Sequence, residues 1–318
     1  MAFDGVTIAG IVSELKEKLI GNRIYKIAQP EKDELLLTVK GSCGQVRMLM
    51  SADASLPLLY LTERNKTSPM TAPNFCMLLR KHLQNARIVS VTQPGLERIV
   101  RFELEHLNEM GDLCRKYLII ELMGKHSNII FCNDKDKIID SIKHISGMVS
   151  SVREVLPGWQ YFIPKTQDKA ELLSCTQEEM AAVLRAKSLP LFKAVYTGFT
   201  GISPSIAQEL CYRAGVDADL PSAGLEAEVL ERMISVLSEL AADIRSEKFC
   251  YNVVYENKQP VEYAAVQLSS YDEGQRRRFE RISELLEYYY AEKNTITRIR
   301  QRSVDLRKIV TTAIERNV

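Results

Sequence analysis

The sequence predicts an α+β protein. Segments rich in β-forming residues follow one another through roughly the first 170 positions, with only two helical stretches among them. Such runs differ from the strict strand–helix alternation of parallel α/β sheets. From residue 171 the apolar residues recur with a helical period. Neither a G-x-G-x-x-G nor a Walker sequence occurs, so a Rossmann or P-loop sheet is not expected.

The chain is expected to open with a helix at residues 4–20, with Asp4 or Thr7 as its cap and Gly21 as its stop. Four short β-type runs separated by turn signals then predict an antiparallel meander. These runs are residues 23–28, 34–40, 45–51 and 58–62. Pro73 suits the first turn of a second helix at residues 74–85.

Strand patterns resume after the second helix. The expected strands are residues 87–92, 97–104, 117–123, 128–132 and 137–142. Few helical signals follow before residue 170, and Pro157-Gly158-Trp159 reads as a closing turn. Residues 1–170 are therefore expected to form one β-rich domain.

The second half is expected to be mainly helical. Helical periodicity over residues 171–248 includes a capping-box pattern that begins at Thr176, and a helix that begins at Ser203-Pro204 and ends at Gly215. Residues 249–273 read as a β-hairpin connector, with strands at residues 251–255 and 262–267 around a turn at residues 257–260. Residues 274–318 contain no Gly or Pro after Gly274 and read as helical throughout, as the start of a coiled coil.

Composition narrows the classes of protein that fit. With 46% hydrophobic and 26% charged residues, the chain can bury a core, which excludes disorder and low-complexity sequence. No apolar run reaches the ~18–20 residues that span a bilayer. The start lacks the basic region of a signal peptide, so a cytoplasmic protein with no membrane partner is expected. The seven scattered cysteines contain no C-x-x-C, so neither a disulfide framework nor a zinc site is expected.

The net charge of +1 conceals an uneven distribution. Residues 275–318 hold eleven basic and six acidic residues and so carry +5, which leaves −4 for the rest of the chain. Two interpretations of this basic stretch stay open: a solvated coiled-coil face, or a surface that follows a phosphate backbone.

The segment with the sequence ELMGKHSNII, which begins at Glu121, is the most unusual of the chain. It joins two apolar strands but has a polar middle, made of Gly124, Lys125, His126, Ser127 and Asn128. A plain hairpin turn needs a glycine or an asparagine, but no lysine and histidine beside it. Two interpretations of this segment stay open: a polar turn and a binding loop. In a binding loop, Lys125 would bind phosphate, His126 would stack or hydrogen-bond, and Gly124 would allow close approach of the backbone.

Glu97-Arg98 is a second candidate, at an expected strand start where adjacent side chains face opposite sides. A surface ion pair fits this pattern. So does a pair in a cleft, in which Arg98 contacts a base and Glu97 accepts from an amino group.

Two further features could contact phosphates. Residues 197–207 have the pattern of a helix-hairpin-helix, in which Gly198, Gly201 and Ser203 would present backbone N–H groups. An ordinary helical corner fits this pattern too. Arg80 and Lys81 form a basic cluster on the second helix, which suits either a solvated face or a phosphate contact.

Patterns of catalysis and metal binding are missing from the sequence. The four histidines, at positions 82, 106, 126 and 144, lack the spacing of metal ligands, and no G-x-S-x-G occurs. We therefore expect no catalytic residue, no metal, no cofactor and no small-molecule substrate.

Taken together, these motifs resemble the amino-terminal part of the NFACT family. The resemblance is carried by Ala2-Phe3-Asp4-Gly5, Leu79-Arg80-Lys81, Leu96-Glu97-Arg98-Ile99-Val100 and, above all, residues 121–128. It extends over the whole chain, since residues 198–207 match the family's helix-hairpin-helix, and residues 288–293 and 305–310 match the start of its coiled coil. The chain ends inside that coil, so the sequence is interpreted as an amino-terminal fragment.

The resemblance implies a factor of ribosome-associated quality control that is not itself an enzyme. Family members bind a large ribosomal subunit with an obstructed peptidyl-tRNA, recruit alanine tRNA in bacteria, and support untemplated tailing of the stalled chain. The family's Asp-Arg and Glu-(Ile/Leu)-Met motifs serve tRNA binding near the anticodon arm. By motif position these fall on Glu97, Arg98, Glu121, Leu122 and Met123, and glutamate replaces the usual aspartate at position 97.

Two alternative functions remain. One is a fibronectin-binding surface adhesin, which would need export. The other follows from a distant likeness to formamidopyrimidine-DNA glycosylases, whose catalysis needs an amino-terminal proline nucleophile. Ala2-Phe3 stands at that place in this sequence, so glycosylase activity is not expected.

Overall fold

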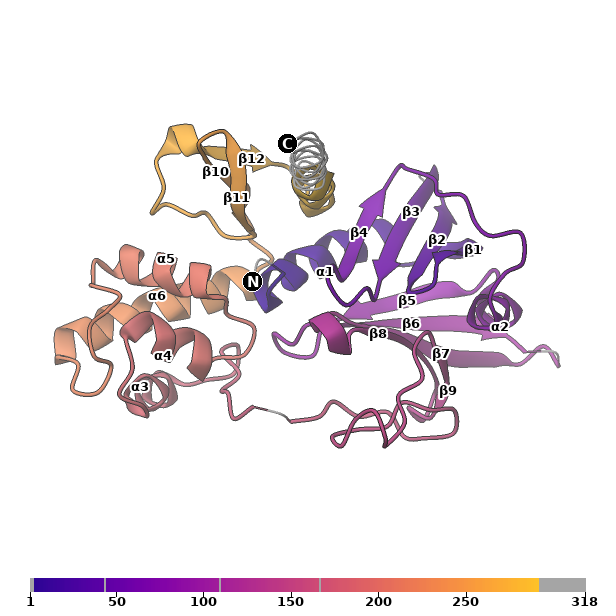
Figure 1. Cartoon of the computed structure of the whole chain (residues 1–318), viewed down its shortest axis with the longest axis horizontal. Helices are drawn as coiled ribbons and strands as arrows, with labels where there is room; N and C mark the ends of the chain where they lie inside the picture. Colours follow the sequence, from indigo (N-terminus) through magenta and orange to yellow (C-terminus); the bar gives the residue numbers. More distant parts are fainter. Residues whose placement is uncertain (1–2, 43, 109, 166, 292–318) are drawn as a thin grey trace, which may run out of the picture.

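The amino-terminal helix α1 (Gly5–Leu19) stands between a large β-sheet and a lobe of helices in the computed structural model (Figure 1). The structure describes residues 3–42, 44–108, 110–165 and 167–291. Asp4 caps α1 by accepting a hydrogen bond from the Thr7 N–H at 2.8 Å. The chain leaves the helix through Gly21, whose φ of 84° is left-handed. The predicted first helix, its cap and its stop are confirmed.

Nine antiparallel strands form the large sheet in the order β4-β3-β2-β1-β5-β6-β7-β8-β9. The strands are β1 (Arg23–Glu31), β2 (Glu34–Gly41), β3 (Gly44–Ser51), β4 (Leu58–Thr62), β5 (Arg87–Thr92), β6 (Ile99–Leu107), β7 (Leu113–Glu121), β8 (Asn128–Asn133) and β9 (Ile138–Ser141). Each strand pairs mainly with its neighbour in sequence, which confirms the predicted meander over residues 23–62 and adds a second meander from β5 to β9.

The two halves of this sheet, β1–β4 and β5–β9, meet through the single register pair Arg23–Arg87. They face each other across one apolar core, which also receives side chains from α1 and from α2 (Asn74–Leu83). Alternate residues of β2 such as Leu35 and Leu37 enter this core, as the two-residue period of a strand requires. The second predicted helix is thus confirmed, two residues shorter than expected.

Four helices build a separate apolar core beyond α1. They are α3 (Gln177–Arg185), α4 (Leu191–Gly198), α5 (Pro204–Ala214) and α6 (Ala227–Arg245). Thr176 and Glu179 form the predicted capping box at the start of α3. Gly215 ends α5 in the left-handed conformation, with φ 65°. Val6 of α1 and Leu96 of the β5–β6 loop enter this second core, so the helical lobe is packed against the β-rich part.

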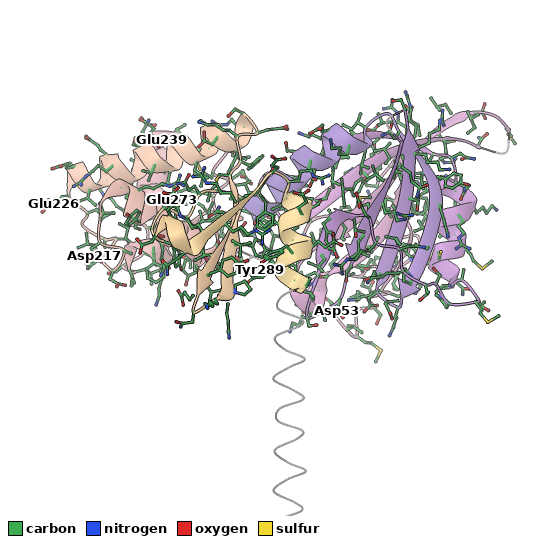
Figure 2. The ribbon with its side chains drawn as sticks, turned by 90° about the horizontal axis from the view of Figure 1, so that it is seen from above. Asp53, Asp217, Glu226, Glu239, Glu273 and Tyr289 are labelled. Atoms are coloured by element: carbon green, nitrogen blue, oxygen red, sulfur yellow. The ribbon has the colours of Figure 1, made fainter. Side chains whose placement is uncertain are left out.

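A three-stranded sheet, in the order β11-β10-β12, follows the helices. It contains the predicted hairpin, as β10 (Tyr251–Glu256) and β11 (Gln259–Ala264), and adds β12 (Arg276–Phe279). A helix at residues 282–291 then stands between the small and large sheets (Figure 2). Tyr289 of this helix packs edge-on against Tyr263 at 4.7 Å between ring centroids.

Two expectations for this region are wrong. Residues 276–279 are a strand and not helix, because they pair with β10 from Tyr251–Phe279 to Val254–Arg276. The hairpin's second strand begins at Gln259, three residues before the expected start, because a two-residue turn at Asn257 and Lys258 closes the hairpin with φ of 49° and 62°. The coiled coil predicted for the end of the chain falls on residues 292–318, outside the described residues. Among the described helices, none is both long and apolar enough to cross a membrane.

Candidate nucleic-acid interface

Glu97 and Arg98 lie in the loop that joins β5 to β6, directly before Ile99 begins the strand. The predicted strand start at Glu97 is therefore wrong, and the strand argument that the two side chains face opposite sides does not apply. The amide of Gln93 fixes this loop by donating to the carbonyl oxygens of Gly5 and Glu97, each at 2.9 Å. The loop is thus attached to the first turn of α1.

Three backbone segments meet at this point: the start of α1, the β5–β6 loop and the α4–α5 loop. The Gly5 N–H donates to the Gly201 carbonyl oxygen at 2.9 Å, so the start of α1 touches the α4–α5 loop. A Cβ added to Gly5 would lie 2.1 Å from the Leu96 carbonyl oxygen, and one added to Gly201 would lie 2.2 Å from the same atom. Only glycine fits both positions, because any side chain would push the three segments apart.

A cluster of charged side chains surrounds Arg98. Burial raises the pKa of Glu97, and the neighbouring Glu171 raises it further, against the opposing effect of Arg98 and Lys169. Burial lowers the pKa of the Arg98 guanidinium, although Glu97 and Asp4 counteract it. An arginine stays charged in proteins, so the loop presents a half-buried cation between carboxylates.

The segment 122–128 lies next to Arg98. The Leu122 N–H donates to the Arg98 carbonyl oxygen at 2.8 Å, which ties the two sequence motifs together. Leu122 is buried and Met123 half-buried, and a single 3-10 turn, η1 (Gly124–His126), follows. Lys125 and His126 are exposed on this turn, which places a cation and an imidazole at the surface.

Buried polar residues hold this turn in shape. Gly124 has a φ of 60°, a conformation that favours glycine. The Ser127 hydroxyl accepts a hydrogen bond from the Met123 N–H at 2.8 Å. Asn128 bridges to the next segment, donating to the Lys143 carbonyl oxygen at 2.9 Å and accepting from the Lys143 N–H at 3.1 Å. Ser127 and Asn128 are 1% and 2% exposed, so in this structure they support the turn from within.

Glu121 is completely buried, with a relative exposure of 0%. Both of its carboxylate oxygens accept from the Arg153 guanidinium, at 2.9 and 2.5 Å. Tyr161 donates to one of them at 2.9 Å. Burial raises the pKa of Tyr161, and Glu121 adds to that effect. The carboxylate therefore ties the segment carrying Arg153 and Tyr161 to the end of β7.

The predicted helix-hairpin-helix residues lie at the last position of α4 and in the loop before α5. Gly198 ends α4 against Val183, where an added Cβ would lie 2.6 Å from a methyl group. Gly201 packs on Leu96, as described above. The Ser203 hydroxyl caps α5 by accepting from the Ile206 N–H at 3.3 Å. Each residue thus has an internal structural role, and phosphate binding by this loop stays a prediction.

Arg80 and Lys81 lie on α2, at the end of the molecule away from the helical lobe (Figure 1). The Arg80 Nε–H donates to the Ile27 carbonyl oxygen at 2.9 Å. The structure therefore brings together the β5–β6 loop, the segment 121–128 and the α4–α5 loop, but not this basic cluster.

Arg153 and Tyr161 were missed by sequence reasoning. They are 32 and 40 residues from Glu121, in a stretch without strand or helix periodicity, so no spacing pattern connects them to it.

From the sequence, Asp4 is expected only as a helix cap and as part of the family resemblance. It is buried beside Ser203, and burial raises its pKa to about 6. Within the described ranges, no three His, Cys, Asp or Glu residues are grouped so as to hold a metal ion.

The chain is an α+β protein in which the β5–β6 loop packs against a helical lobe and is hydrogen-bonded to the polar segment 121–128. A family model described as NFACT N-terminal and middle domains matches residues 4–318. The chain therefore belongs to the NFACT family, as the sequence motifs predicted.

The curated relatives include proteins named Rqc2 homolog RqcH. The protein of Bacillus subtilis (strain 168) is 34% identical over 320 residues, covering 100% of this chain and 54% of its own. The protein of Streptococcus suis (strain 05ZYH33) is 30% identical over 318 residues, covering 100% of this chain and 53% of its own. The chain thus spans about half the length of these relatives.

A solved structure supports the fold. The N-terminal part of the fibronectin/fibrinogen-binding protein from Streptococcus suis aligns with a TM-score of 0.74 at 29% identity, covering 91% of this chain and 99% of that one. The MutM (Fpg) protein of Thermus thermophilus aligns with a TM-score of only 0.39 at 13% identity.

Proposed function

We propose that this chain is the tRNA-binding part of a ribosome quality-control factor. The observation that carries the proposal is the hydrogen bond between the Leu122 N–H and the Arg98 carbonyl oxygen. It joins two motifs that are more than twenty positions apart in the sequence, and both correspond to tRNA-binding motifs of the family. The names of the RqcH relatives support the same function.

The roles of the individual side chains follow from their exposure. Lys125 and His126 are exposed and would contact RNA directly, the lysine at a phosphate and the histidine by stacking or hydrogen bonding. Arg98 and Glu97, both half-buried, would contact a base or phosphate at the edge of the loop. Glu121, Ser127 and Asn128 are buried, so we assign them to positioning the loop. Leu122, Met123 and Gly124 would set its backbone.

In the full protein, this part would recruit alanine tRNA to a large ribosomal subunit that still carries an obstructed peptidyl-tRNA. Untemplated alanine tailing of the stalled chain would follow, with the peptide-bond chemistry supplied by the ribosome. The α4–α5 loop would act as a helix-hairpin-helix that contacts the phosphate backbone, and the end of the chain would begin a coiled coil. This function places the protein in the cytoplasm.

The test is equilibrium binding of alanine tRNA by the 318-residue chain. Arg98→Ala and Lys125→Ala should each weaken binding and make it less dependent on salt concentration, because each removes a cation from the interface. Arg232→Ala is the matched control, since it removes the same charge from an exposed arginine of α6 that pairs with Glu228 on its own helix. Equal affinity of all four proteins would contradict the assignment.

Fibronectin binding is the second candidate, because the solved relative from Streptococcus suis carries that activity in its name. Immobilised fibronectin should retain the chain if this activity is shared. Retention that Arg98→Ala and Lys125→Ala leave unchanged, together with no affinity for tRNA, would favour the adhesin.

A further inference from the structure

Residues 169–171 lie between the two loops that the proposed function assigns to RNA. The Ala170 N–H donates to the Gly198 carbonyl oxygen at 2.8 Å, and the Thr200 N–H donates to the Ala170 carbonyl oxygen at 2.9 Å. On the other side, the Leu96 N–H donates to a Glu171 carboxylate oxygen at 3.2 Å. This segment therefore joins the end of α4 to the loop that carries Arg98.

Lys169 is the cation of this segment. Its ammonium donates one hydrogen bond, to the Tyr196 carbonyl oxygen near the end of α4, at 3.0 Å. An ammonium has three N–H donors, so two remain for a ligand. Within the described part of the chain, the structure gives Lys169 no ion pair with a carboxylate. The side chain is half-buried, and its hydrogen bond to Tyr196 holds the ammonium at the end of α4.

The surroundings of Lys169 bring like charges together. Burial lowers the pKa of Lys169, and the nearby Arg98 guanidinium lowers it further, with a smaller effect in the same direction from Lys187. Glu97 acts in the opposite direction. Glu171, the other acidic neighbour of this loop, accepts from the Leu96 N–H through one carboxylate oxygen, and its other oxygen is buried without a hydrogen-bond partner among the described residues. Two cations that the fold holds near each other are stabilised when an anion binds between them.

We propose that Lys169 is a further phosphate-binding residue, which together with Arg98 holds a backbone phosphate of tRNA between the β5–β6 loop and the end of α4. The proposal rests on the proposed function, because it adds a residue to the same interface. It also gives the helical lobe a cationic side chain at the interface, which the internally packed Gly198, Gly201 and Ser203 do not supply.

The test compares Lys169→Ala with the wild-type chain in equilibrium binding to alanine tRNA and to a second, unrelated tRNA over a series of salt concentrations. A phosphate contact carries no sequence information, so Lys169→Ala should weaken both complexes by the same factor, roughly tenfold. The slope of log affinity against log salt should become shallower by about one. Lys169→Arg should retain most of the affinity, because it keeps the charge.

Lys248→Ala is the matched control, since it removes an exposed lysine paired with Asp243. Unchanged affinity of Lys169→Ala would overturn the inference, and so would weaker binding with an unchanged salt slope, which indicates a purely structural role. The proposed function fails separately if the wild-type chain does not bind tRNA. If the wild-type chain binds and Arg98→Ala weakens the complex while Lys169→Ala does not, only the role of Lys169 is wrong.

Discussion

Glu121 is a carboxylate whose charge is compensated inside the protein. It is fully buried, and it accepts hydrogen bonds from Arg153, which is 10% exposed by side chain, and from Tyr161. The family resemblance predicts that Glu121 belongs to a tRNA-binding motif, but a side chain without exposure contacts nothing outside the fold. We infer that the residue contributes to RNA binding by positioning the loop that starts directly after it.

Replacing Arg153 tests this role. Arg153→Met leaves the buried Glu121 without its ion pair, which should lower the free energy of unfolding by about 3–5 kcal/mol. Arg281→Met is the matched control, because Arg281 pairs with Glu284 on the surface and should cost about 1 kcal/mol or less. Urea denaturation measures both. Equal losses in the two variants would show that burial of the Glu121 pair has no special effect.

The pH dependence of stability should report on Asp4. Burial raises the pKa of this carboxyl to about 6, whereas an aspartate in an unfolded chain titrates near 3.9. Between these values the folded state holds a proton that the unfolded state has lost, so the contribution of Asp4 to stability falls as the pH rises. Above pH 6 this contribution is constant at its least favourable value.

Asp4→Asn isolates this effect, since asparagine caps helices equally well and does not titrate. The stability of the variant relative to wild type should rise between pH 4 and pH 6, by up to about 1.4 kcal/mol per pH unit, and then level off. Denaturation at several pH values measures the difference. A difference that stays constant across this range would contradict the raised pKa.

At the scale of elements, the contact of α1, the β5–β6 loop and the α4–α5 loop joins the β-rich part to the helical lobe. Gly201→Ala should destabilise the protein strongly, because its Cβ would lie 2.2 Å from a backbone oxygen and its φ is 76°. Gly21→Ala is the matched control, with a φ of 84° and no atom within 4 Å of the added Cβ. Only the φ strain, about 1 kcal/mol, should apply there. Similar losses of melting temperature in the two variants would show that the backbone contact is unimportant.

Most elements could be predicted because their patterns are local. Apolar periodicity, turn residues and caps located the helices, the first meander and the strands of the second one. β12 could not be predicted, since Arg276, Arg277 and Arg278 are ordinary helix formers and only pairing with β10 makes them a strand. The start of β11 was misplaced because its proline, Pro260, suggested a turn. This strand is an edge strand, where proline is tolerated.

At the scale of the whole molecule, the motifs of the candidate site could be predicted separately, but their arrangement at one place on the surface could not. Motif strings identified Glu97, Arg98 and residues 121–128, and the structure brings them into contact. The internal partners Arg153 and Tyr161, and the position of Lys169 between two loops, depend on the folded chain alone. The net charge of +1 did not indicate whether the protein binds nucleic acid, because a nearly neutral protein can still hold a few cations at one place.

The most direct measurement is site-specific photo-crosslinking from position 126, the exposed histidine of the loop, to alanine tRNA. A photoreactive residue at position 126 should crosslink to the anticodon arm, and Arg98→Ala should reduce the yield. The same residue at position 258, in the exposed turn between β10 and β11, serves as the control and should give no crosslink. Crosslinking from position 258 but not from position 126 would contradict the assignment of this loop as the tRNA-binding surface.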